Sequence, residues 1–295
     1  MRLNVLFHQT SFLLTGLWTT LGTQWLFYKG AANSLSFLTQ LSSYMGMILV
    51  GLLIPLLLRK RQEAYQAIRS TLVDMNGFEL ESHDRVHNTG PIVIESPVYQ
   101  RSVMKLAMVD IVANSCATLG FSLIGSGMYQ VIYSSVVIWC AILTYLFMNR
   151  VLSKIQWVAI CGTSVGLAIS SLENLTTINA SGNTKLLAFG TLVTLAATCF
   201  YACMYVYSDH ILSKETPSPL PARVCFFTGL YTTSFTVLYI LLYTWPRIDQ
   251  MIKIDSSTDL RTVVAVYGLL TLANATHAWN YYELIDSTGN ASYPH

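Results

Sequence analysis

A stripe of polar side chains lies within one strongly apolar stretch of the sequence, residues 102–124. Asp110, Asn114 and Thr118 follow one another at intervals of four residues, which places all three on one face of a helix. An ionisable side chain at the centre of a helix that crosses a bilayer costs about 2.5–3.5 kcal/mol. Asp110 is therefore expected to face a cavity or a polar partner. Two roles stay open: contact with a solute or a coupling proton, and a structural hydrogen bond to a neighbouring helix.

Other apolar stretches carry polar groups with similar spacing. Gln130 and Ser134 are four residues apart, and the amide of Gln130 suits an uncharged polar solute as well as a hydrogen bond between helices. Asn274 and His277 share a helix face, and a neutral imidazole can exchange a proton near neutral pH, although a packed histidine fits equally. The residues whose spacing predicts a solute pathway are Asp110, Asn114, Thr118, Gln130, Ser134, Asn274, His277 and, in the first apolar stretch, Gln24.

Motifs of enzymes and of metal sites are absent from the sequence. It has no paired-aspartate protease motif, no His-Glu-x-x-His pattern and no glycine-rich nucleotide loop. Cys199 and Cys203 share a helix face, but no histidine or acid accompanies them, so packing residues are expected rather than a metal pair. We expect no enzyme activity, metal, cofactor or nucleic-acid partner.

The composition is that of a membrane protein, with 53% hydrophobic and 11% charged residues against roughly 25% charged in an ordinary soluble domain. Roughly 20 apolar residues cross a bilayer as a helix. The chain is therefore predicted to be an all-α, polytopic transmembrane bundle in contact with lipid. Eight spans are predicted, at about residues 10–28, 36–58, 102–124, 127–148, 154–172, 185–208, 223–245 and 262–283.

The basic residues predict an orientation. Eleven lysines and arginines fall on the side of the N-terminus and five on the other side, with Lys105 inside a helix. Such a bias places the N-terminus and the long loop 59–101 in the cytosol. The sequons at Asn174 and Asn179 then lie on the opposite side, where they can be glycosylated. Both an endomembrane and the plasma membrane fit these features.

Two pairs of segments resemble each other in the same order. Ala113-Asn114 matches Ala273-Asn274, and Gly16-Leu-Trp-Thr-Thr-Leu21 matches Gly190-Thr-Leu-Val-Thr-Leu195. This predicts a repeat of five spans, with one copy at residues 1–172 and an incomplete copy of three spans at 185–295. An odd repeat inserts its second copy upside down. Two full copies need ten spans, so eight of an expected ten are present, and residues 286–295 are expected to form a turn like that at 125–129.

A motif of small residues lies in the fifth predicted span. Gly162 and Gly166 are four residues apart, which lets another helix approach closely. The expected contact is within one molecule, and the alternative is a homodimer.

The region 105–172 resembles the drug/metabolite transporter superfamily. The similarity rests on Asp110, Asn114 and the pattern Ser126-x-x-x-Gln130, followed by a short basic turn at 149–154 and by Gln156-Trp-Val-Ala-Ile-Cys-Gly-Thr-Ser-Val-Gly166. Within the superfamily the chain is most similar to solute carrier 35, in the F-type branch that resembles nucleotide-sugar transporters. The resemblance implies ten helices in two inverted halves around a central cavity, with the fifth and tenth helices peripheral.

The resemblance also bears on the solute. The third position after Gln130 is basic in some relatives, where it can hold an anion, but here it is Tyr133, a further candidate for the pathway. We therefore predict a secondary-active transporter that moves a small polar organic solute by alternating access. The alternative, suggested by the missing spans, is a truncated membrane protein without transport activity or an accessory subunit.

Overall fold

The bundle consists of helices and their connections. In the computed structural model, residues 3–76, 95–148, 153–178, 184–214, 217–256 and 258–291 are described, and these contain no strand. The elements are α1 (Leu3–Tyr28), α2 (Leu38–Leu49), the 3₁₀ turn η1 (Val50–Leu53), α3 (Ile54–Asn76), α4 (Gln100–Tyr133), α5 (Val136–Met148), α6 (Lys154–Ile178), α7 (Thr184–Ser213), α8 (Pro221–Tyr239), the π-helical turn η2 (Ile240–Thr244), the 3₁₀ turn η3 (Trp245–Arg247), α9 (Ile248–Met251) and α10 (Leu260–Ala291).

Five helical segments of the described residues are long and apolar enough to cross a bilayer. The other three predicted spans coincide with α1, α6 and α10, which have 26, 25 and 32 residues and lie outside this group of five. The all-helical polytopic bundle is thus confirmed, while the number of eight spans stays a prediction. The five segments are Leu38–Ala67, Gln100–Gly125, Gly127–Met148, Lys185–Ser213 and Pro221–Met251.

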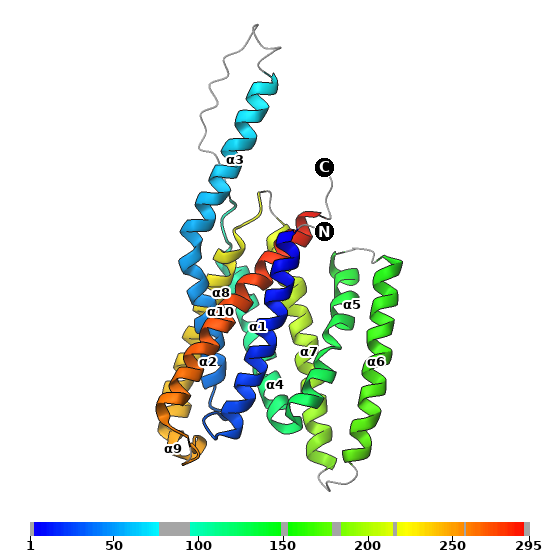
Figure 1. Cartoon of the computed structure of the whole chain (residues 1–295), viewed down its shortest axis with the longest axis vertical. Helices are drawn as coiled ribbons and strands as arrows, with labels where there is room; N and C mark the ends of the chain where they lie inside the picture. Colours follow the sequence, from blue (N-terminus) through cyan, green and yellow to red (C-terminus); the bar gives the residue numbers. More distant parts are fainter. Residues whose placement is uncertain are drawn as a thin grey trace.

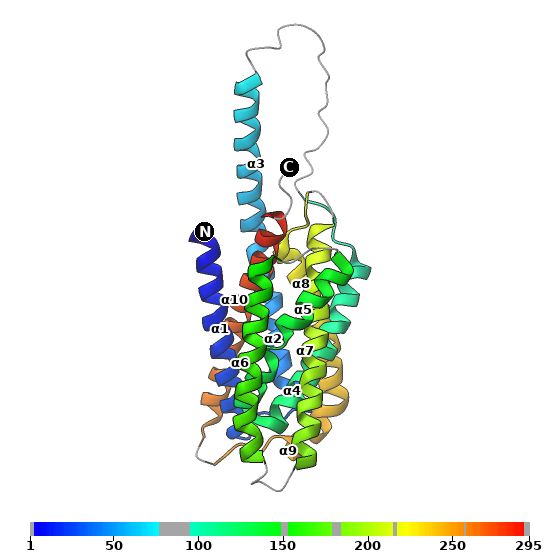
Figure 2. The ribbon, with the colours of Figure 1, turned by 90° about the vertical axis from the view of Figure 1, so that its right-hand side faces the viewer.

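Two helix pairs organise the bundle. The most extensive contacts join α4 to α7 and α1 to α10, and α2 packs against both α8 and α10. Figure 1 shows these helices side by side with their long axes nearly aligned, and Figure 2 shows the same arrangement from the side. α1 begins and α10 ends at the same end of the bundle, where α3 projects beyond the other helices (Figure 1).

Two apolar clusters lie at opposite ends of α10. One cluster contains Val263 and Leu270 of α10, packed against Leu26 near the end of α1. The other contains Tyr282, packed against Val50 and against Leu106 of α4. Between them α10 carries more polar residues, so the helix is fixed at both ends by apolar burial and leaves its middle free for a polar site.

Helix α4 contains the break expected between the third and fourth spans. Gly125 has φ 76° and ψ 169°, a backbone conformation that glycine adopts without the steric cost of a side chain. A second break, absent from the prediction, lies at Ser134–Ser135, between α4 and α5. The predicted span over 127–148 thus consists of two helices that meet at this turn, where the Ser134 hydroxyl donates to the Val131 carbonyl.

Two predicted helix ends were wrong. α6 continues to Ile178, so Asn174 is helical rather than in a loop, and Asn179 lies outside the described residues. α10 continues to Ala291, where a turn was expected from residue 286. Hydropathy marks where apolar residues end, but a helix continues through polar residues that favour it, and one glycine within it costs only about 1 kcal/mol.

The crossing of α2 and α10 depends on Gly46. A Cβ atom built on this glycine would lie 2.7 Å from the Ala275 amide nitrogen and 2.8 Å from the Thr271 carbonyl oxygen. The side chain of Ser42, one turn earlier, is hydrogen-bonded to the Thr271 hydroxyl at 2.9 Å. The backbones therefore meet where a side chain would not fit, and this close approach positions both helices for the site described below.

Gly46→Ala is expected to lower the stability of the bundle, because overpacking costs about 1–3 kcal/mol. Gly268→Ala is the matched control, since no described atom lies within 4 Å of a Cβ there and alanine favours a helix by about 1 kcal/mol. Thermal unfolding of the purified protein in detergent measures both changes. An unchanged or raised midpoint for Gly46→Ala would contradict the close contact.

Candidate functional site

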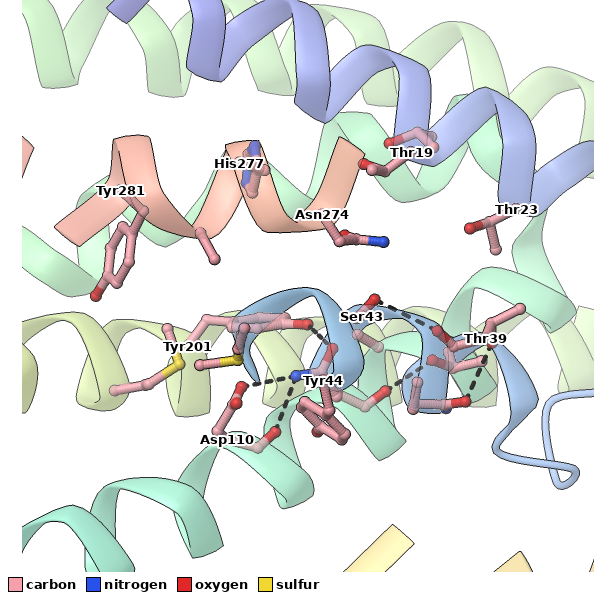
Figure 3. A pocket seen from close by; sticks show the side chains of 18 of the residues that line it. Thr19, Thr23, Thr39, Ser43, Tyr44, Asp110, Tyr201, Asn274, His277 and Tyr281 are labelled. Atoms are coloured by element: carbon pink, nitrogen blue, oxygen red, sulfur yellow. Dashed lines mark hydrogen bonds between the residues drawn. The ribbon is translucent and has the colours of Figure 1, made fainter. Parts of the chain in front are cut away.

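A cavity of about 270 Å³ lies in the middle of the bundle, between α1 and α10 on one side and α2, α4 and α7 on the other. Figure 3 shows polar side chains from these helices pointing into the space between them. Small hydroxyl groups, two asparagines and tyrosines make up most of its lining. The polar lining residues other than tyrosine are Thr19, Thr20, Thr23, Thr39, Gln40, Ser43, Asp110, Asn114, Thr118, Asn274 and His277.

Asp110 is held by a short chain of hydrogen bonds. Its carboxylate oxygen Oδ1 accepts a bond of 2.7 Å from the Asn114 amide, whose own oxygen accepts a bond of 2.8 Å from the Tyr201 hydroxyl. The Asp110 side chain is only 4% exposed. The i, i+4 spacing on α4 thus brings Asp110 and Asn114 together as expected, and Tyr201 links them to α7.

Most of the residues predicted from spacing meet at this cavity. Six of the nine pathway candidates line it, and they come from two helices that are far apart in the sequence, α4 and α10. The polar stripes therefore indicated a common site. The six residues are Asp110, Asn114, Thr118, Tyr133, Asn274 and His277.

The other three candidates lie outside the lining. Gln130 is exposed, and its amide donates a bond of 3.2 Å to the hydroxyl of Thr20, which does line the cavity. Ser134 bonds within its own turn, and the Gln24 amide donates to the Tyr28 hydroxyl at 3.1 Å. Gln130 is therefore connected to the cavity through one hydroxyl, whereas Ser134 and Gln24 are satisfied locally.

His277 is wedged between α1 and α10. Its ring stacks on Phe12 with a centroid distance of 4.0 Å, and Nδ1 lies 3.2 Å from the Thr15 hydroxyl and 3.1 Å from the Phe12 carbonyl oxygen. Because the carbonyl can only accept, Nδ1 carries the proton in that bond. One edge of the ring thus joins the two helices, while the residue also lines the cavity.

Tyrosines form a continuous wall of the cavity. The Tyr129 and Tyr133 rings of α4 stack at 5.5 Å, Tyr133 meets Tyr201 of α7 edge to face at 5.5 Å, and Tyr205 lies 5.2 Å from Tyr281 of α10. The hydroxyls of Tyr133 and Tyr205 are 2.9 Å apart. Both Tyr201 and Tyr205 of α7 line the cavity.

One comparison with known proteins decides the family. A family model for nucleotide-sugar transporters matches residues 62–266, which is more than two thirds of the chain and runs from α3 into α10. The chain belongs to the nucleotide-sugar transporter family. A search of curated proteins found none that matches it. Family membership and the apolar helices together make the chain an integral membrane protein that transports a polar solute.

Helix α2 gives the transporter a set of polar groups that the sequence interpretation missed. Thr39 and Ser43, and likewise Gln40 and Tyr44, are four residues apart and line the cavity. The same spacing marked Asp110 and Asn114, so the signal was present. The Gln40 Nε2 and the hydroxyls of Tyr44 and Tyr281 are buried without a hydrogen-bond partner among the described residues. Buried polar groups are usually paired, so these three atoms stand out among the polar groups of the lining residues.

The small-residue motif of the transporter lies at the edge of the bundle. Helix α6 lies at the right-hand edge of the bundle in Figure 1, and no described atom lies within 4 Å of a Cβ built on Gly162 or Gly166. Close packing of another helix at these glycines is thus not seen among the described residues. A contact with a second copy of the chain stays a prediction.

The hydrogen bond between Asn114 and Tyr201 can be measured with a double-mutant cycle. Asn114→Ala and Tyr201→Phe remove the same bond, so the double variant should lose less stability than the sum of the two, by about 0.6 and up to about 1.7 kcal/mol. Reversible unfolding of the four proteins in mixed micelles gives this coupling energy.

The matched control cycle pairs Tyr201→Phe with Ser115→Ala. The Ser115 hydroxyl donates to the Ile111 carbonyl of its own helix at 2.6 Å, so these two changes should be additive. Equal coupling in both cycles would argue against a specific link between α4 and α7.

Proposed function

We propose that this protein is a secondary-active transporter that moves a small polar organic solute by alternating access. The observation that carries the proposal is the central cavity, whose polar lining comes from both ends of the chain and contains buried groups without partners. Ligand sites in carriers of inverted repeats lie near the middle of the membrane, between the repeats.

The packing of the helices supports two inverted units, at residues 1–172 and 185–295. The proposed repeat makes α1 equivalent to α7 and α4 equivalent to α10, so α1–α10 and α7–α4 become two equivalent contacts between the units. Both are the extensive pairs of the bundle. The matched glycines also agree, because Gly16 faces His277 of α10 and Gly190 faces Leu123 of α4.

Polar contacts at one end of the bundle are candidates for a closed gate. The Arg61 guanidinium donates to the Ser218 hydroxyl at 2.9 Å, and Ser218 donates to an Asp286 carboxylate oxygen at 3.2 Å. Arg223 and Glu95 form an ion pair of 2.7 Å. Asp286 lies five residues beyond Tyr281 of the cavity wall, or about 7.5 Å along α10. These contacts therefore close the route from the cavity to that end.

We propose that this end faces the cytosol. It contains the start of α1 and the projecting α3, and Arg61 and Arg223 lie there, in agreement with the positive charge that predicts cytosolic loops. Within the family we propose the F-type branch of solute carrier 35, to which the motif around Asp110 and Gln130 is most similar. Asp110 is proposed to contact the solute or the coupling proton.

Alternating access predicts that a cavity residue becomes accessible from each side of the membrane in turn. In a variant without the six native cysteines, Ser43→Cys introduces a nearly isosteric thiol into the lining. A membrane-impermeant thiosulfonate reagent, added to either side of oriented proteoliposomes, is expected to label it from both sides.

Ser234→Cys is the control for this labelling. Ser234 is exposed on α8 outside the cavity lining, and its hydroxyl bonds within the helix at 2.7 Å. A thiol there faces lipid and should stay unlabelled. Labelling of Ser43→Cys from one side alone would argue for a fixed pocket instead of a carrier.

A further inference from the structure

The described lining of the cavity contains an acidic side chain but no lysine or arginine. Among the described residues that line it, Asp110 is the one Asp, Glu, Lys or Arg. The basic side chains whose contacts are known lie near the ends of the bundle and have partners there, as in the ion pairs of Lys29 with Asp255 and of Arg223 with Glu95. A phosphate group is usually bound by arginine or lysine, and this lining offers neither.

The carboxylate of Asp110 is also incompletely satisfied. Oδ1 accepts the bond from Asn114, and none of the described groups donates to the second oxygen. A buried ion is costly unless it is paired and hydrogen-bonded. The first turn of α2, which carries Thr39 and Gln40, supplies only the partial positive charge of a helix N-terminus. A positively charged ligand would supply the missing partner.

The tyrosine wall favours the same kind of ligand. The face of an aromatic ring is negative and attracts cations, most strongly where water is excluded. Two rings of the described residues already have a basic group over them, Tyr99 and Tyr243, and neither lines the cavity. The faces of Tyr133, Tyr201 and Tyr205 are therefore not occupied by a cation of the protein itself.

We propose that the solute of this transporter is a small organic cation with a flat or quaternary ammonium centre, bound between the Asp110 carboxylate and the tyrosine wall. The inference rests on the proposed function, because it identifies the class of solute that the same cavity carries. A cationic solute distinguishes this chain from the anionic nucleotide sugars after which its family is named. The amide nitrogen of Gln40, which has no partner among the described residues, adds a hydrogen bond to a polar substituent of the cation.

Three probes of different charge test the proposal directly. 1-Methylnicotinamide is a flat cation, nicotinamide has the same ring and amide without the charge, and uridine monophosphate is an anion. Calorimetric titration of the purified full chain in detergent should show 1-methylnicotinamide binding at least about tenfold more tightly than nicotinamide, with uridine monophosphate weaker than both. Equal binding of the first two, binding of neither, or tightest binding of the nucleotide would overturn the proposal.

Substitutions in the lining test whether Asp110 and Tyr133 cause the preference for the cation. Asp110→Asn keeps an oxygen that can accept from Asn114 but removes the charge, so the preference for the cation should fall to within about threefold, about 0.7 kcal/mol. Ser115→Ala, on the same helix but outside the lining, should keep it. Tyr133→Leu removes one aromatic face without changing the charge and should reduce the preference severalfold. A preference unchanged in both lining variants contradicts this site.

The two proposals fail separately. Thiol labelling from both sides requires no knowledge of the solute. If the protein is labelled from both sides but prefers uridine monophosphate, alternating access stands and the cation proposal is wrong. If the protein binds 1-methylnicotinamide but is labelled from one side alone, the cation site stands and the proposed carrier mechanism is wrong.

Discussion

The arrangement of the bundle depends on one constraint, a carboxylate held inside an apolar fold. Asp110 is 4% exposed, and a charge at that depth requires partners that lipid cannot supply. Asn114 supplies one from the same helix and is fixed in turn by Tyr201 of α7. The hydrogen bonds thus reinforce the extensive contact between α4 and α7, and they leave the second carboxylate oxygen facing the cavity. The side chain that is hydrogen-bonded in this network is also the one proposed to contact the solute.

Close helix contacts are what make room for the cavity. The backbones of α2 and α10 meet at Gly46, and a polar seam joins α1 to α10, in which the buried Asn280 bonds both His8 and Ser11 at 2.7 Å. Because these contacts fix each helix at separate points, the segments between them need not touch. Hydroxyl groups of α1 and α2 face the cavity. The free-energy cost of burying these polar groups is offset by apolar packing elsewhere in the bundle.

The polar part of the site could be predicted from the sequence, since Asp110, Asn114 and His277 are polar residues at helical spacing within apolar stretches. The tyrosine wall could not, because spacing does not distinguish an aromatic ring at a cavity from one at the membrane interface or in the core. Ser134 was misplaced for a different reason. The prediction assumed an unbroken helix over 127–148, whereas a turn lies at Ser134–Ser135, where the Ser134 hydroxyl donates to Val131 and Ser135 approaches Thr198 of α7.

The two breaks of the fourth helix join charge recognition to conformational change. α4 carries Asp110 before the break at Gly125, and it carries Tyr129 and Tyr133 after that break and before the one at Ser134. A ligand that contacts both the carboxylate and the rings therefore bridges the two segments of α4 on either side of Gly125. Such a ligand shifts the equilibrium toward the arrangement in which both contacts are best, and only differential binding of this kind can drive a change of state. Membership of a family fixes the fold, while the lining of this cavity determines which solute produces that shift.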